Sequence, residues 1–239
     1  MLGGGQGYIE LGGGHSSLTQ GNPSWTDAYM RGAMALSESN VLHTEISRQD
    51  RYGDTGWYFS GGLTHVFTEN WYADGFVGFS SRCFFLPKYR TDGFIHRKLL
   101  PHKQLVLTVG GGNDKYKDIH SDYRLNTEAD YYLGPSWILQ SGITFTHSDP
   151  GSTTVHAQYF AVSEGQNKRH YIVLRGEYGR EAYELIGPAT ALINFPLHDV
   201  SVTWRQWIAP SWGINLTVER YNEPIFNRTG ATLGFFLDF

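Results

Sequence analysis

Apolar and polar side chains alternate along most of this chain. The clearest run is 122–133, where one face carries Asp122, Arg124, Asn126, Glu128, Asp130 and Tyr132 and the other carries Tyr123, Leu125, Thr127, Ala129, Tyr131 and Leu133. Successive side chains of a β-strand point to opposite faces, so this run predicts a strand with one charged face and one apolar face. Tyrosines near both ends of the apolar face favour a strand that crosses a membrane.

The same period of two recurs from one end of the chain to the other. Further runs lie at 6–14, 26–37, 41–49, 57–67, 71–82, 89–99, 104–112, 137–146, 153–163, 169–186, 189–208, 212–219 and 228–239. Together the runs predict an all-β, antiparallel transmembrane β-barrel of about fourteen strands, an even number as in bacterial single-chain barrels.

Residues 168–208 are the least regular part of the pattern. We expect two long strands there, Arg169 to Ile186 and Ala189 to Ile208, joined at Gly187-Pro188 and standing well above the membrane. A separate short hairpin over 180–195 would raise the count to about sixteen strands, and about twelve is the other alternative.

The segments between the runs fall into two alternating classes. The short connections are 37–40, 68–70, 100–102, 134–136, 164–167 and 209–211, and the longer, more polar ones are 14–24, 48–56, 83–88, 113–121, 148–152, the region around 187–188, and 221–227. Short periplasmic turns alternating with longer outer loops are typical of outer-membrane barrels, and they put both termini on the periplasmic side. Trp71, Trp137 and Trp212 each follow a short turn, which indicates an interfacial girdle.

Composition agrees with an all-β membrane chain. Aromatic residues make up 15% of it and there are 29 glycines, which suits pleated strands joined by tight turns. The mean hydropathy of −0.36 is no obstacle, because only every second residue of a spanning strand meets lipid. A net charge of −4 gives no indication of the basic surface that nucleic-acid binding requires. The single cysteine, Cys83, excludes an intramolecular disulfide, and we expect it to be a small buried hydrophobe.

The C-terminal run ends on Phe239, with Leu233, Phe235 and Leu237 at alternating positions before it. This end resembles the signal by which the barrel-insertion machinery recognises bacterial outer-membrane barrels. More narrowly, the chain resembles the YaiO-type outer-membrane β-barrel family in residues 57–65, in the turn at 133–135 and in 212–239. The resemblance implies a barrel in the bacterial outer membrane, in contact with lipid and lipopolysaccharide, and a link to polysaccharide export.

We expect residues 1–239 to form a single barrel domain. Met1 is followed by Leu-Gly-Gly-Gly, without the basic and apolar regions of an export signal. We therefore take Met1 as an artificial start, from which an export signal or a periplasmic domain has been removed.

Alternation assigns many charged residues to the lumen: Arg31, Glu45, Asp74, Arg82, Arg124, Glu128, Asp130, Arg175, Glu177, Arg205, Glu219 and Arg228. One interpretation is a network of ion pairs that fills the interior, with Arg124, Glu128 and Asp130 paired to arginines such as Arg175 or Arg205. The other is a hydrated passage for a polar solute, with Tyr29, Tyr72, Phe76 and Tyr132 as stacking surfaces for sugar rings. Barrels of about eight strands are filled and those of about sixteen carry a channel, so both interpretations stay open.

Two functions follow from these interpretations. The first is a conduit for a polar solute, such as an exported polysaccharide, across the outer membrane. The alternative is a closed structural or receptor barrel that displays its outer loops without transport. We expect no enzyme, because His147, Ser148 and Asp149 precede Pro150-Gly151 and are better explained by a turn than by a hydrolase site. No His/Cys cluster has metal-ligand spacing, so we expect no catalytic residue, cofactor or metal.

Overall fold

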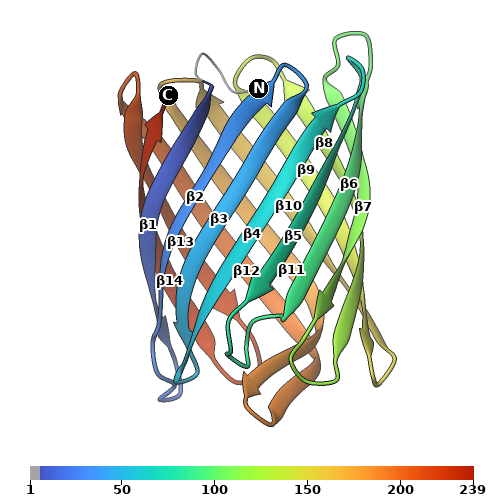
Figure 1. The fold of residues 1–239 in the computed structure, drawn as a ribbon, viewed down its shortest axis with the longest axis vertical. Helices are drawn as coiled ribbons and strands as arrows, with labels where there is room; N and C mark the ends of the chain where they lie inside the picture. Colours follow the sequence, from blue (N-terminus) through green and yellow to red (C-terminus); the bar gives the residue numbers. More distant parts are fainter. Residues whose placement is uncertain (1–5) are drawn as a thin grey trace.

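The fold is a closed antiparallel β-barrel. The computed structural model describes residues 6–239, which form fourteen strands: β1 (Gly7–Leu18), β2 (Trp25–Ser37), β3 (Asn40–Arg51), β4 (Asp54–Val66), β5 (Trp71–Ser80), β6 (Tyr89–Leu99), β7 (Leu105–Lys115), β8 (Ser121–Leu133), β9 (Trp137–Asp149), β10 (Thr153–Gln166), β11 (His170–Gly187), β12 (Thr190–Ala209), β13 (Trp212–Asn222) and β14 (Asn227–Asp238). Each strand pairs with its neighbours in sequence, and β1 pairs with β14 to close the sheet (Figure 1). The predicted fold and strand count are confirmed, whereas Met1 lies outside the described residues.

The barrel has two different mouths. Both termini lie at one end, which we call the terminal mouth, and the turns at 38–39, 67–70, 100–104, 134–136, 167–169 and 210–211 lie there too (Figure 1). The opposite end, the distal mouth, carries the loops at 19–24, 52–53, 81–88, 116–120, 150–152, 188–189 and 223–226. Several strands continue further toward the distal mouth than the alternation indicates, so most of these loops are shorter than predicted, whereas the loop at 81–88 is longer because β5 ends at Ser80.

The outer wall is apolar. Leu11, Val77, Leu125, Leu174 and Leu233 are all exposed, in a band that would be an aggregation surface in water but matches the hydrocarbon of a bilayer. Within the described part of the chain, no helix is long and apolar enough to span a membrane.

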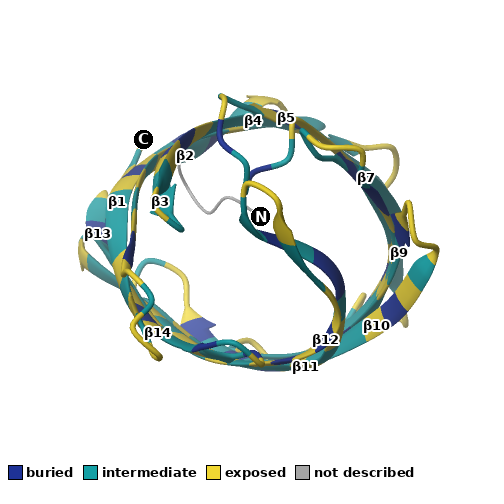
Figure 2. Cartoon of the chain, turned by 90° about the horizontal axis from the view of Figure 1, so that it is seen from below, coloured by how far each residue is buried: buried dark blue, intermediate teal, exposed yellow. Residues whose placement is uncertain are grey.

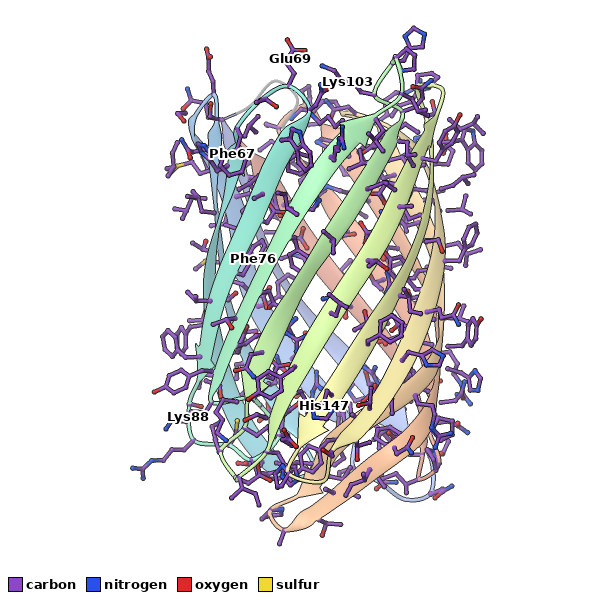
Figure 3. The ribbon with its side chains drawn as sticks, turned by 90° about the vertical axis from the view of Figure 1, so that its right-hand side faces the viewer. Phe67, Glu69, Phe76, Lys88, Lys103 and His147 are labelled. Carbon is purple, nitrogen blue, oxygen red and sulfur yellow. The ribbon has the colours of Figure 1, made fainter. Side chains whose placement is uncertain are left out.

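Aromatic side chains border the apolar band at both ends. Near the terminal mouth, Trp71 and Trp137 are exposed on the wall, and Trp212 stacks on Phe235 with ring centroids 5.3 Å apart. Toward the distal mouth, the exposed aromatic residues are Trp57, Phe79, Tyr89, Tyr123 and Tyr178. Side chains project from both faces of the wall, with Glu69 and Lys103 at the terminal mouth and Lys88 toward the distal one (Figure 3). Two aromatic girdles therefore mark the span.

β11 and β12 are the longest strands, with 18 and 20 residues. Pairing of β11 with β10 stops at Gly179, opposite Ala157, and pairing of β12 with β13 stops at His198, opposite Asn222. Residues 180–197, which we call the distal hairpin, pair only within β11 and β12 and with no other strand. The distal hairpin bends inward and crosses the opening of the barrel (Figure 2). The two long strands expected here are confirmed, and the hairpin that they form bends over the mouth.

Local backbone and burial explain the bend. Gly179 has a φ of 154°, and a Cβ there would lie 2.5 Å from the carbonyl oxygen of His156, so this point of departure requires glycine. Beyond it, Tyr183, Leu185 and Phe195 are buried. In an upright hairpin these side chains would meet water, at a cost of about 1.5–3 kcal/mol for each large apolar side chain.

The alternation of the wall can be tested on two neighbouring residues of β8. Leu125 is exposed on the outer wall, whereas Asn126 lines the lumen. We expect Leu125→Arg to lower the free energy of unfolding by about 2–4 kcal/mol, because it places a charge in lipid, and Asn126→Arg to lower it by clearly less. Guanidinium titrations in lipid vesicles measure both variants. Equal losses would contradict the assignment of the two faces.

Candidate functional site

The lumen holds a polar cavity of about 460 Å³ on the side of β5 to β11. Its lining includes Asp74, Phe76, Arg90, Asp92, Phe94, His96, Thr108, Arg124, Asn126, Glu128, Thr144, Tyr159 and Arg175. Acidic and basic groups alternate with aromatic faces around the cavity. Such a lining can hydrogen-bond hydroxyl groups and stack against rings, which is what a polar ring-bearing solute needs.

Glu10 organises the lumen near the terminal mouth. Its side chain is 1% exposed, and its Oε1 accepts hydrogen bonds from Arg31 Nη2 at 2.7 Å and Tyr29 Oη at 2.8 Å. Its Oε2 accepts one from Arg205 Nη1 at 2.9 Å. β12 is separated from β1 by two strands of the wall, so the contact between Arg205 and Glu10 passes through the interior. This cluster therefore narrows the terminal half of the lumen.

Glycines and aromatic rings make room for the Glu10 cluster. The hydroxyl of Tyr29 lies over Gly234, where a Cβ would come within 2.6 Å of it. The guanidinium of Arg205 lies 3.5 Å from the ring centroid of Phe236, which is fully buried. The ring of Phe236 and the ion pair with Glu10 together hold the Arg205 guanidinium in position.

A second ionic cluster lies toward the distal mouth. Arg124 on β8 bonds to Asp92 on β6 at 2.6 Å and also pairs with Asp114 on β7. Arg90 pairs with Asp92 at 2.7 Å. The two arginines and two aspartates balance in charge, and Arg90, Asp92 and Arg124 line one side of the cavity.

Between the two clusters, the lining consists of mixed polar and aromatic groups. His96 Nε2 lies 2.9 Å from Asp74 Oδ2, and its ring stacks on Tyr72 at 4.2 Å between centroids. Tyr159 donates a hydrogen bond to Glu128, and the guanidinium of Arg175 lies 3.7 Å from the Tyr159 ring centroid. These groups keep polar atoms directed at the cavity.

The distal hairpin is held against loops from several parts of the barrel. Tyr183 donates a hydrogen bond of 2.6 Å to Asp118 in the β7–β8 loop and stacks on His120 at 3.7 Å between centroids. Tyr52 in the β3–β4 turn donates one of 2.8 Å to Glu184. Because these loops come from different sides of the mouth, the hairpin spans it.

An aromatic cluster completes the distal closure. The ring of Trp25 contacts Tyr52 at 4.9 Å and Phe226 at 5.5 Å between centroids, and Tyr52 contacts Phe84 at 6.1 Å. Phe226 is 1% exposed. The closure therefore has an apolar centre as well as polar anchors.

Three carboxyl groups gather where the distal hairpin meets the β13–β14 loop. Glu181 accepts a hydrogen bond of 3.1 Å from Tyr221, and Glu223 in the β13–β14 loop lies close enough to Glu184 for the two carboxyl charges to act on each other. Burial, followed by the nearby charge of Glu184, raises the pKa of Glu181 to about 7. Burial and the contact with Glu184 raise the pKa of Glu223 to about 9.

The lumenal residues predicted from the alternation can now be placed. Arg31 and Arg205 meet at Glu10, Tyr72 and Asp74 surround His96, and Arg124, Glu128 and Arg175 line the cavity. Further predicted residues have lumen-side positions on their strands: Tyr29, Glu45, Phe76, Asp130, Tyr132, Glu177, Glu219 and Arg228.

Two predictions about these residues are wrong. Arg82 does not face the lumen, because it is exposed in the β5–β6 loop, where the strand has ended. Arg124, Glu128 and Asp130 do not pair with Arg175 or Arg205. Their partners are the neighbouring Asp92 and Asp114, Tyr159, and Gln140, respectively.

The sequence analysis missed Glu10, the most buried charge of the lumen. Ile9 and Leu11 flank it on the outer wall, so alternation alone would have placed it inside. The Arg90 and Asp92 pair could have been found in the same way on β6. The carboxyl group of Glu223 had no such signal, because it lies in a loop.

His147 and Ser148 lie on opposite faces of β9. The Nδ1 atom of His147 lies 2.8 Å from Thr154 Oγ1, and its Nε2 atom lies 3.5 Å from Asp149 Oδ2. Ser148, in contrast, is buried on the inner side. Figure 3 shows His147 toward the distal mouth. The two side chains are not brought together.

A profile of the YaiO membrane beta barrel domain matches residues 6–184, well over half of the chain. The chain belongs to this family. It is therefore a protein of the bacterial outer membrane, and the lipid-facing wall and aromatic girdles of this YaiO barrel are those of a membrane-spanning protein. A search of curated proteins finds no match.

Solved structures share the fold of this YaiO barrel at very low identity. A CymD monoaromatic hydrocarbon channel matches with a TM-score of 0.62 and 6% identity, over 97% of this chain and 88% of that one. A bacterial polysaccharide outer membrane secretin gives 0.59 and 8%, over 98% and 99% of the two chains. The loop L8 deletion mutant of OmpT from Vibrio cholerae gives 0.56 and 9%, over 96% and 98%. The fold is thus that of porins and channels.

A substitution of Glu10 tests whether the ion pairs of the Glu10 cluster stabilise the folded barrel. We expect Glu10→Ala to lower the free energy of unfolding by about 3 kcal/mol, the lower end for a broken buried pair, because Arg31 keeps access to lumen water. Glu69→Ala, which breaks the exposed pair with Lys103 at the terminal mouth, should leave stability unchanged. Equal unfolding midpoints for both variants would show that the cluster does not stabilise the barrel.

Proposed function

We propose that this YaiO barrel is a conduit for a polar solute, such as an exported polysaccharide, and that the distal hairpin closes it in the present structure. The observation that carries the proposal is the polar cavity of about 460 Å³ inside the wall. A barrel with a purely structural interior would not need a polar cavity at mid-height.

The chemistry of the lining supports a sugar chain as the solute. Asp74, Asp92 and Glu128 are balanced by Arg90, Arg124 and Arg175, so the lining has no strong preference for either sign of charge. The rings of Phe76, Phe94 and Tyr159 offer faces on which a sugar ring can stack. Such a lining suits a neutral, hydroxyl-rich solute better than an ion.

The structural neighbours give this proposal only general support. One of them carries the description of a polysaccharide outer membrane secretin, and another that of a hydrocarbon channel, at 8% and 6% identity. Since these opposite kinds of solute occur on one fold, the argument rests on the lining residues of this chain.

We also propose an orientation and a set of partners. The terminal mouth would face the periplasm and the distal mouth the outside, in a membrane of lipid and lipopolysaccharide. The C-terminal strand ending in Phe239, which is exposed on the wall, would be the segment read by the barrel-insertion machinery. No catalytic step is part of this proposal.

A closed structural or receptor barrel is the second candidate. The distal hairpin favours it, because Tyr183, Leu185 and Phe195 are buried in the closed position. The Glu10 cluster favours it as well, because it narrows the terminal half of the lumen.

Removal of the distal hairpin separates the two candidates. Gly179 and Leu197 are paired residues, and Leu197 has the N–H that closes a two-residue turn, so Asn-Gly can join them in place of residues 180–196. For a conduit, we expect steady stepwise currents in planar bilayers, at least several-fold larger than those of the parent barrel. Silence of a variant that still resists unfolding in detergent would favour the closed barrel.

The cavity charge gives a second test in the same hairpin-deleted background. Glu128 lines the cavity, so Glu128→Gln should shift the reversal potential in a salt gradient toward anions, because one negative charge leaves the path. The matched control is Glu69→Gln, whose side chain lies outside the lumen at the terminal mouth. An unchanged reversal potential for Glu128→Gln would place the current outside this cavity.

A further inference from the structure

The distal hairpin closes over carboxyl groups that have too few partners. Glu223 is 9% exposed, and neither of its carboxyl oxygens has a hydrogen-bond partner among the described residues. Glu184 uses Oε1 to accept the hydrogen bond from Tyr52, whereas its Oε2 is buried without a partner. Burying two neighbouring carboxylates without hydrogen-bond partners costs free energy unless the two groups share a proton.

The surroundings leave this acid excess uncompensated. The charged and titratable groups near the two carboxyls are Arg51 on β3, Tyr52 in the β3–β4 turn, Tyr116 in the β7–β8 loop, Glu181 on β11, Tyr221 on β13 and Arg228 on β14. Three further carboxyl groups lie next to members of this set: Asp27 on β2 near Arg51 and Arg228, Glu177 on β11 near Glu181, and Glu219 on β13 paired with Arg228. Arg51 and Arg228 are the cations of this set, and Arg228 already pairs with Glu219 at 2.8 Å. Carboxyl groups therefore outnumber arginines.

We propose that a proton shared by Glu223 and Glu184 latches the distal hairpin, so that the distal mouth is closed when the proton is bound and released when it is lost. In the latched form, the Glu223 carboxyl O–H donates a hydrogen bond to Glu184 Oε2. This satisfies both orphaned groups and joins the hairpin to the β13–β14 loop. The role of the latch as a gate rests on the proposed conduit, whereas the motion of the hairpin does not.

Glu181 adds to the same dependence on pH. Its carboxyl group is on the hairpin, next to Glu184, and its only hydrogen-bond donor among the described residues is Tyr221. The pKa values of about 7 for Glu181 and about 9 for Glu223 in the closed form both exceed the ordinary value of 4.5. A raised pKa stabilises the closed form fully below the ordinary value, and this contribution is lost as the pH rises through the raised one. The hairpin should therefore loosen between about pH 5 and pH 9.

A distance measurement in the full barrel tests the latch. Spin labels are placed on Ala189→Cys at the hairpin tip and Lys88→Cys on the β5–β6 loop, both exposed, with Cys83→Ser removing the native cysteine. At pH 5 we expect one short distance. As the pH rises to 9, a longer distance should appear, with the closed-to-open ratio falling by up to about tenfold per pH unit for each titrating carboxyl.

Matched variants assign the effect to these carboxyl groups. Glu181→Gln with Glu223→Gln keeps hydrogen-bond donors without charge, so the hairpin should stay closed at pH 9. Glu69→Gln, at the terminal mouth, should behave like the parent. A pH response that persists in the double variant overturns the proposal, because groups other than these carboxyls would then be responsible for it.

Measurements on the parent protein test the latch even if the double variant does not fold. Identical distance distributions at pH 5 and pH 9 would overturn the latch. A hairpin that moves with pH in a barrel that never conducts, even without residues 180–196, would uphold the latch and refute the conduit.

Discussion

The structure depends on one constraint, which is that no backbone N–H or C=O group can be left unpaired in hydrocarbon. The sheet meets it by closing on itself. β1 and β14 pair along their whole length, and the last residue takes part, since Phe239 and Gly7 exchange backbone hydrogen bonds of 3.0 Å in both directions. With the edges gone, every side chain must point either to lipid or to the lumen, and this produces both the apolar wall and the crowded polar interior.

That division explains why so much of the fold could be predicted from the sequence. Alternation in segments such as 122–133 reports directly which solvent each face meets, and the short turns before Trp71, Trp137 and Trp212 mark one rim. The same rule places Arg124 and Glu128 inside. It failed for Arg82, because alternation was extended past the end of β5 into a loop, where the rule has no physical basis.

Alternation gives the face of a residue but not its partner. Arg124 finds Asp92 and Asp114 on the two preceding strands, because register and strand tilt decide which side chains meet. Glu10 joins Arg31 on the adjacent strand to Arg205 three strands away, a contact across the interior that depends on the curvature of the closed barrel. The inward bend at Gly179 is equally hidden, since it arises from a close approach of β11 to His156.

The length of β11 and β12 links the wall to the closure. A strand needs only about 9–11 residues to cross the membrane. β11 and β12 have 18 and 20 residues, so both strands extend beyond the membrane-spanning wall. The apolar residues of this extension, among them Tyr183, Leu185 and Phe195, draw it into the mouth, and burial of each is worth about 1.5–3 kcal/mol. Apolar burial alone would make that closure permanent. The acidic groups enclosed with it oppose the closure, because burying them unpaired costs free energy of similar size. Burial of its apolar side chains thus favours the closed position of the hairpin, and burial of its unpaired carboxyl groups disfavours it.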